Sequence, residues 1–99
     1  MTIPSYEEMM LPILTFLKDK KEHSNEESLE YIKRFFSVTD EEAETLLPSG
    51  KQTRLANRVA WARVYLKKAG LLDSPQRAKL KITEEGLRVL SSNPKEITD

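Results

Sequence analysis

Apolar residues recur at helical spacing along most of this chain, and the longest such pattern lies between residues 47 and 72. It opens with the turn signal Pro48-Ser49-Gly50 and closes at Gly70, a residue type favoured just past the end of a helix. Nothing interrupts a helix from about residue 53 to residue 69. Apolar positions at alternating spacings of four and three predict one buried stripe on this helix: Leu55, Val59, Ala62, Leu66 and Ala69.

Three shorter helices are predicted before the long one. Each follows a hydroxyl residue with a glutamate three positions later, the spacing of a capping box: Ser5 and Glu8, Ser24 and Glu27, Thr39 and Glu42. The first candidate spans residues 5–21. Because Pro12 removes a backbone donor, the helix either starts near Leu11 with Pro12 in its first turn or begins earlier and kinks. We favour an early irregular turn followed by a main helix from about Leu11 to Asp19. We expect the third helix to run from Asp40 to Leu46 and to stop before Pro48.

The second of these helices begins after Ser24 and ends at about Ser37-Val38, with Leu29, Ile32 and Phe36 facing inward. After Gly70 the apolar period shortens toward two. Residues 71–72 and 80–82 read as short strands on either side of turn chemistry and a basic segment, Arg77 to Lys79, which predicts a β-hairpin.

Thr83 caps a last helix that contains Leu87 and Leu90 and fades before Asn93-Pro94. The predicted fold class is therefore mainly α with a small β-hairpin, in the element order of a winged helix-turn-helix. We expect one domain over residues 1–94 and an unstructured tail, or the start of a linker, over residues 95–99.

Charge is strongly segregated although the formal net charge is zero. Residues 1–50 contain five lysines and arginines against eleven aspartates and glutamates, whereas residues 51–81 contain nine basic residues and only one acid, Asp73. A basic face of this kind is suited to a polyanion, most often DNA. In the alternative interpretation, the acidic and basic parts of the fold neutralise each other.

Composition narrows the class of protein further. The chain has no cysteine, so it has no disulfide, thiolate zinc site or cysteine nucleophile. No apolar run approaches the roughly 18–20 residues that span a bilayer, and the N-terminus lacks a signal-peptide pattern. His23, the single histidine, lies in a charged connector without partners for a metal site. We expect a cytoplasmic domain that has no membrane segment, cofactor, metal site or catalytic site.

A family resemblance rests on several short motifs taken together. They are Leu47 to Gly50, Asn57-Arg58, Trp61-Ala62 and Ala69-Gly70-Leu71, with Ile3-Pro4, Pro12, Arg77 and the segment from Ile82 to Gly86 extending the match over nearly the whole chain. In their order and spacing they resemble the N-terminal domain of Mrr-type restriction proteins. The resemblance implies a winged helix that binds double-stranded DNA. It also implies a separate C-terminal nuclease domain, of a type associated with cleavage of DNA bearing methylated bases.

Two features depart from that family pattern. Ala78 and Leu80 stand where the resemblance leads us to expect a glycine after the wing arginine and an aromatic residue two positions later, which puts an aromatic wing contact in doubt. The nuclease half is also absent from these 99 residues. If the natural protein is longer, these residues form its recognition module.

Eight residues are predicted to contact DNA, on the turn before the long helix, on the helix and on the hairpin: Ser49, Lys51, Arg54, Asn57, Arg58, Arg77, Lys79 and Lys81. For two of them a structural role competes. Asn57 is suited equally to bonding an adenine edge and to holding the preceding turn by bonding its backbone. Arg58 lies nearer the buried stripe, where an ion pair with an acid of the first half is favoured slightly over DNA.

Trp61 lies off the main stripe, and we favour its packing, against the hairpin, over stacking on a base.

Two functions of different class remain open. The first is a DNA-binding recognition domain of a restriction system. The second is a winged-helix module for protein interaction or homodimerisation that has no DNA affinity. An enzyme in its own right is disfavoured because the sequence offers no nucleophile, metal cluster or phosphate loop.

Overall fold

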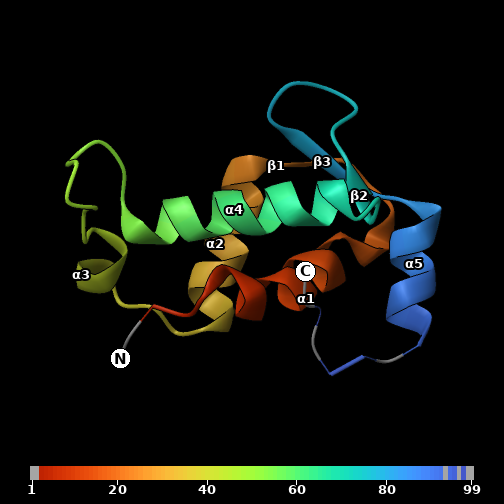
Figure 1. Cartoon of the computed structure of the whole chain (residues 1–99), viewed down its shortest axis with the longest axis horizontal. Helices are drawn as coiled ribbons and strands as arrows, with labels where there is room; N and C mark the ends of the chain where they lie inside the picture. Colours follow the sequence, from red (N-terminus) through yellow and green to blue (C-terminus); the bar gives the residue numbers. More distant parts are fainter. Residues whose placement is uncertain (1–2, 93, 96, 98–99) are drawn as a thin grey trace.

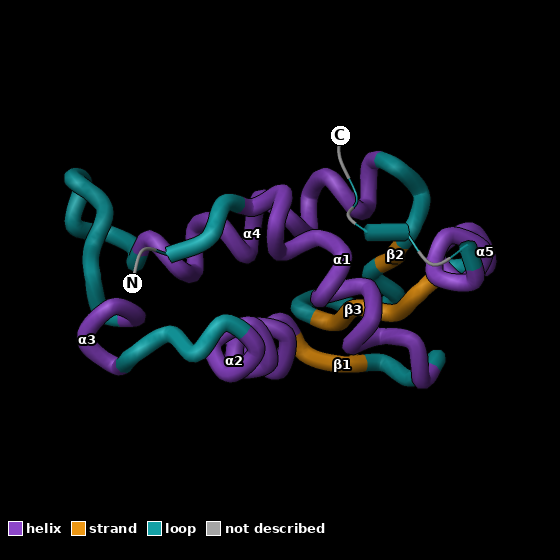
Figure 2. Tube along the Cα trace, turned by 90° about the horizontal axis from the view of Figure 1, so that it is seen from below, coloured by secondary structure: helices purple, strands orange, loops and turns teal. Residues whose placement is uncertain are grey.

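Helices pack together with a small sheet in the computed structural model, which describes residues 3–92, 94, 95 and 97 (Figure 1). The elements follow in this order: α1 (Tyr6–Phe16), a 3₁₀ turn η1 (Leu17–Asp19), β1 (His23–Ser24), α2 (Asn25–Phe35), α3 (Asp40–Ala43), α4 (Arg54–Lys68), β2 (Leu72–Asp73), β3 (Lys79–Ile82) and α5 (Glu84–Ser91). In both overall views α3 and α5 lie at opposite ends of the molecule, with α4 between them (Figures 1 and 2). The predicted mainly α fold with a small hairpin is confirmed.

Three capping boxes begin α1, α2 and α3, as predicted. In each box the hydroxyl accepts a hydrogen bond from the glutamate backbone N–H, and the glutamate carboxylate accepts one from the capping residue's own N–H: Ser5 with Glu8, Ser24 with Glu27, and Thr39 with Glu42. Two otherwise unsatisfied donors per helix are thereby paired at each start. The ends of these helices were harder to predict.

Pro12 lies inside α1, so the expectation of a main helix starting near Leu11 is wrong. The capping box at Ser5 begins the helix six residues earlier than Pro12. Beyond that start, the apolar face buries Met9, Met10, Ile13 and Leu14 almost completely. A proline in a helix costs about 3 kcal/mol, whereas each fully buried large side chain contributes about 1.5–3 kcal/mol, so burial outweighs the broken turn.

The third helix is also shorter than expected, because α3 ends at Ala43 and not at Leu46. The next residues close the loop before α4. Arg54 N–H donates to the Thr45 carbonyl at 2.9 Å, Leu47 N–H donates to the Gln52 carbonyl at 2.9 Å, and Leu46 forms a β-bridge with Thr53. These contacts require an extended backbone at positions 45–47, which ends the helix.

Strand β1 was not predicted, and it completes a three-stranded antiparallel sheet in the order β1-β3-β2. His23 pairs with Leu80 on one side of β3, and Leu72 pairs with Ile82 on the other. The hairpin of β2 and β3 is the predicted wing. With β1 added, the elements follow the order of a winged helix, in which α4 has the position of the recognition helix.

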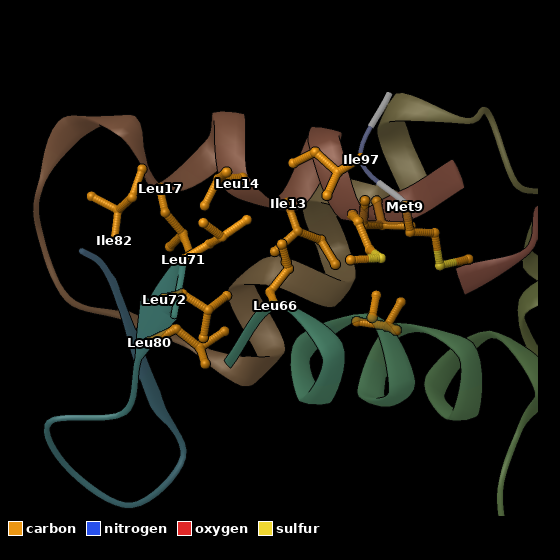
Figure 3. Packing of buried hydrophobic residues seen from close by; sticks show 14 of the residues in the cluster. Met9, Ile13, Leu14, Leu17, Leu66, Leu71, Leu72, Leu80, Ile82 and Ile97 are labelled. Atoms are coloured by element: carbon orange, nitrogen blue, oxygen red, sulfur yellow. The ribbon is translucent and has the colours of Figure 1, made fainter. Parts of the chain in front are cut away.

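The core lies where α1 packs against α4, α2 and the sheet. Figure 3 shows Ile13 of α1 beside Leu66 of α4, with Leu71, Leu72 and Leu80 gathered at the wing end. The predicted stripe of α4 is confirmed at four positions, which are buried: Leu55, Val59, Ala62 and Leu66. Ala69 is exposed and was predicted wrongly, because it caps the helix where the chain turns away.

Gly70 and Gly86 join the end of α4 to α5. Gly70 has a φ of 75°, and the next residue's N–H donates to the Leu66 carbonyl at 3.0 Å, which completes a helix-ending Schellman turn. A Cβ on Gly86 would lie 2.2 Å from the Leu71 carbonyl oxygen, so α5 approaches this turn more closely than any side chain permits. Thr83 caps α5 and also donates its hydroxyl to the Gly70 carbonyl at 2.6 Å. The wing base is therefore held firmly.

The end of the chain contributes to the core as well. Ile97 is only 8% exposed and packs in the main cluster (Figure 3). It lies within the predicted tail at residues 95–99. Residues 93, 96, 98 and 99 lie outside the described part of the chain, and the domain boundary at residue 94 stays a prediction.

Candidate nucleic-acid interface

The long helix α4 has a second stripe, directed away from the core. It repeats the spacings of three and four used by the buried stripe and consists of Arg54, Asn57, Trp61, Val64 and Lys68. Four of these residues are exposed, and Asn57 is partly exposed. This outward stripe has polar residues at both ends and apolar ones in the middle. In Figure 1 the loop before α4 and the wing both extend above the helix, whereas α1 lies below it.

Ser49 and Lys51 lie at the tip of the loop that precedes α4. The loop is closed at its base by the Leu47–Gln52 backbone bond and tightened by Gly50, whose φ is 71° and whose N–H donates to the Leu47 carbonyl at 2.8 Å. Ser49 Oγ accepts from the Lys51 N–H at 3.4 Å. Both side chains are exposed, one turn before the first residue of the outward stripe.

Arg54 and Asn57 form the beginning of the outward stripe. The Arg54 side chain is exposed. The Asn57 amide donates to the Gln52 side-chain oxygen at 3.3 Å, so it does bond the preceding turn, although through a side chain and not through backbone. Its role as a DNA contact stays a prediction.

Arg58 holds the N-terminal segment. Its guanidinium donates to the carbonyl oxygens of Ile3 and Pro4, the second at 3.2 Å. We had favoured a structural role for Arg58, in an ion pair with an acid of the first half. The role is structural, but the partners are backbone carbonyls and not an acid. Of the eight predicted DNA contacts, this one is already occupied in the folded chain.

The wing supplies the remaining three predicted residues. Arg77 is exposed at the turn, and Lys79 and Lys81 alternate along β3 with the buried Leu80 and Ile82. The two lysines therefore share the face of the strand that is directed away from the core. Leu80 is 2% exposed, so the position where the family pattern led us to expect an aromatic faces the core.

Ala78, at the end of the wing turn, has a φ of 60°. This left-handed conformation favours glycine, the residue that the family pattern led us to expect there. The Ala78 carbonyl accepts a hydrogen bond from the Asn25 N–H at 3.0 Å, which ties the wing to the start of α2. Ala78 therefore holds the wing turn in a backbone conformation that costs alanine more than it would cost glycine.

Within the part of the chain that the structure describes, the basic segment of residues 51–81 is not neutralised by ion pairs. Among the described residues the ion pairs are His23–Asp19, His23–Glu27, Lys33–Asp40 and Arg88–Glu85, none of which involves residues 51–81. Within the same part of the chain, seven basic side chains there make no hydrogen bond or ion pair: Lys51, Arg54, Arg63, Lys67, Arg77, Lys79 and Lys81. The interpretation that the two parts neutralise each other is not supported by these contacts.

Sequence reasoning missed Arg63 as a candidate site residue. It lies in a groove of about 130 Å³ between α2 and α4, lined also by Asn25, Glu26 and Gln52. Burial lowers the pKa of Arg63, because the guanidinium is partly removed from water. Its position next to the buried stripe, at the spacing of four from Val59, was the available signal.

Trp61 is 48% exposed, so the prediction that it packs against the hairpin is wrong. Its ring is tilted by 35° relative to the ring of Tyr65, with centroids 6.1 Å apart, and Tyr65 stacks on Tyr6 of α1 at 4.9 Å. Lys68 lies 5.7 Å from the Tyr65 ring centroid. The tryptophan is thus supported on one side and open on the other.

Other kinds of site were sought in the described residues. They contain no group of three or more histidine, cysteine, aspartate or glutamate side chains placed to hold a metal ion. In that same part of the chain, no helix is both long and apolar enough to cross a membrane.

Comparison with known proteins identifies a family and a relative. The family model described as the Mrr N-terminal domain matches residues 6–92. The Type IV methyl-directed restriction enzyme EcoKMrr of Escherichia coli K12 is 31% identical over 100 residues, an alignment that covers 100% of this chain and 33% of that relative. The chain therefore spans a third of that relative's length. No solved structure matches significantly.

Proposed function

The chain belongs to the family of Mrr N-terminal domains, and from this membership we propose that it is the DNA-binding part of a restriction system. The observation that carries the proposal is the set of unpaired basic side chains on the loop before α4, on α4 and on the wing, within the described residues. No intramolecular ion pair has to be broken before these cations bind phosphates. Their electrostatic attraction to a polyanion is therefore not reduced by competition within the protein.

In the proposed complex α4 enters the major groove with its outward stripe toward the bases. The helix has 15 residues, or about 22 Å of length, and its diameter with side chains, roughly 10–12 Å, matches a major groove about 12 Å wide. Lys51 and Arg54 precede and begin the helix, where groove-entering residues lie. Ser49 and Asn57 are further proposed contacts of this end.

The wing is proposed to contact phosphates beside the groove. Arg77 at the turn and Lys79 and Lys81 on β3 are the contacting residues. Such contacts set the register of the protein on the duplex and contribute no sequence preference of their own. Arg58 is assigned to folding and not to DNA, because Ile3 and Pro4 already bond its guanidinium.

The finer part of the proposal concerns modified bases and cleavage. The relative in Escherichia coli K12 is named methyl-directed, and we propose that methylated DNA is the class of target for this domain also. We assign cleavage to parts of such longer proteins outside the matched third, and recognition to the domain itself. The purified chain should then leave DNA uncut in the presence of Mg²⁺.

Fluorescence anisotropy with a labelled duplex at several salt concentrations tests the proposal. With four to six phosphates contacted, log affinity should fall with log salt at a slope of roughly −4 to −5, from about −0.9 per phosphate. Methylated and unmethylated duplexes are compared side by side. Absence of binding even at low salt would contradict DNA recognition by this chain.

One observation favours the alternative of a protein-interaction or homodimerisation module. Phe35 on α2 is 55% exposed and Leu46 is 53% exposed, both outside the basic segment. Sizing chromatography of the wild-type chain and of a Phe35→Ala variant separates the two functions. A dimer that dissociates in the variant, together with no duplex affinity, would favour the alternative.

A further inference from the structure

The middle of the outward stripe has an apolar surface that folding does not explain. Trp61 is 48% exposed and Val64 is 39% exposed, on the side of α4 opposite the buried Leu55, Val59, Ala62 and Leu66. Exposed apolar residues of this size are informative when they gather on a surface proposed to bind. Trp61 and Val64 lie one turn apart and therefore form a single patch.

The surroundings of this patch identify its partner. Arg54 and Asn57 lie on one side of it along the helix and Lys68 on the other, and α4 contains no acidic residue. Apolar surface framed by cations along one helix matches a polyanion that presents apolar groups in a groove. An acidic protein surface would provide charge along the whole stripe and no defined apolar contact for its centre.

One side of Trp61 contacts an aromatic row within the fold. The ring leans on Tyr65, and Tyr65 in turn stacks on Tyr6 with an interplanar angle of 13°. This aromatic row joins α4 to α1 and restricts the ring of Trp61 on the side that it covers. A rigid aromatic contact of this kind loses little entropy when it is buried.

In the DNA major groove the apolar group within reach of a helix is the C5-methyl group of a pyrimidine. We propose that Trp61 and Val64 are specificity-determining residues that contact pyrimidine C5-methyl groups, of thymine or of 5-methylcytosine, when α4 occupies the groove. The inference rests on the proposed DNA-binding function and adds to it the chemical group that is read and the residues that read it.

The test uses three duplexes of one sequence: one with thymine, one with uracil in place of thymine, and one with 5-methylcytosine in place of cytosine. The double variant Trp61→Ser/Val64→Ser leaves no methyl or aromatic group at either position and is compared with wild type. Phe35→Ala is the matched control, since it removes an exposed aromatic side chain elsewhere. Thermal melts by circular dichroism establish that each variant is folded. Trp61 is the single tryptophan, so its fluorescence in the wild type reports contact directly.

Wild type and Phe35→Ala should lose roughly fourfold in affinity for each contacted methyl group removed. In the double variant that dependence should vanish while the slope of affinity against salt is unchanged, and wild-type fluorescence should change on binding. Equal wild-type affinity for all three duplexes would overturn the inference and leave DNA binding intact. Methyl dependence that persists in the double variant would overturn it also. Failure of the wild type to bind any duplex would instead contradict the proposed function itself.

Discussion

The acidic residues of the first half and the basic residues of the second half have different roles in this molecule. Before residue 51, Glu8, Glu27 and Glu42 complete capping boxes, and other acids pair with His23 and Lys33. From residue 51 to residue 81, most basic side chains have no partner among the described residues. The acids therefore stabilise helices locally, and the bases remain available to a partner.

The comparison separates two uses of charge in one small domain. A carboxylate at a helix start pairs backbone donors that would otherwise be unsatisfied, so its loss reduces stability. An unpaired exposed cation contributes little to the free energy of unfolding, so its loss should leave the fold intact. Substitutions in the first half should consequently reduce stability, and substitutions in the second half should reduce binding.

The largest effect is expected from Lys51→Glu/Arg54→Glu. Two proposed phosphate contacts become repulsive, so duplex affinity should fall at least about 100-fold near 0.1 M salt and the salt slope should become less steep by about two. The melting temperature should change little, because both side chains are exposed and unpaired within the described residues. Anisotropy titrations and thermal melts measure the two quantities on the same preparation.

A control of equal charge change is Lys18→Glu/Lys95→Glu. Both lysines are exposed and lie outside the loop, α4 and the wing. Because only long-range charge is altered, affinity should fall far less than in the first variant, especially at physiological salt. Equal losses in the two double variants would mean that net charge, and not the proposed interface, governs binding.

Arg58→Ala tests a basic residue that we assign to stability and not to DNA binding. This guanidinium bonds the Ile3 and Pro4 carbonyls, so its removal should lower the free energy of unfolding by about 1.5–3 kcal/mol. Affinity of the folded variant for the duplex should stay within about twofold of wild type. Urea unfolding and anisotropy provide the two measurements. A variant that is stable but binds weakly would return Arg58 to the DNA interface.

The difference between Arg58 and its neighbours also marks how far the sequence could predict this site. Capping boxes were predictable because both partners lie within one helical turn in sequence, and the buried stripe of α4 was predictable because its apolar spacing repeats along the helix itself. The partners of Arg58 lie 54 and 55 positions away, and no local pattern specifies them. Strand β1 was missed for the same reason, since two polar residues become a strand only by pairing with β3.

The solvent exposure of Trp61 could not be predicted from the sequence either. Its position off the main stripe was evident from the sequence, but its exposure depends on where α1 and the hairpin end around α4. The basic segment as a whole was predictable from composition. The sequence could not show whether acids elsewhere lie close enough to form ion pairs with the basic segment. Among the described residues, none of them does.

Ser24→Ala tests the role of the capping boxes in stability, at the start of α2. Loss of the hydroxyl that accepts from the Glu27 N–H should cost about 1 kcal/mol, or roughly 4–8 °C in melting temperature for a domain of this size. Duplex affinity should not change. Ser24→Thr retains the acceptor and should restore most of the loss, which would be unexpected if the serine acted only through its size.

Ala78→Gly should make a smaller change in the opposite direction. Relief of the left-handed backbone at the wing turn should stabilise the fold by about 0.5–1 kcal/mol, after the greater freedom of glycine in the unfolded chain is subtracted. Thermal melts measure the gain. As a control, Ala60→Gly places the same change inside α4, where it should destabilise by about 1 kcal/mol.

The smallest expected effect concerns the single histidine and the acids on either side of it. Burial lowers the pKa of His23, but its hydrogen bonds to Glu27 at 3.0 Å and to Asp19 at 2.8 Å outweigh that effect and raise the pKa above its ordinary value of 6.5. The pKa of Glu27 is lowered to about 2, mainly by the hydrogen bond from the Ser24 backbone N–H and secondly by the hydrogen bond with His23. Both carboxylates therefore remain charged when the imidazole titrates.

A raised histidine pKa contributes stability that is fully present below pH 6.5 and is lost as pH rises through the higher folded value. The melting temperatures of wild type and His23→Gln should therefore differ more at pH 5.5 than at pH 8.5. Because the carboxylates have lowered pKa values, the difference should shrink again well below pH 4. A gap that does not depend on pH would mean that His23 acts by packing on Phe16, whose ring centroid lies 4.7 Å away, and not by charge.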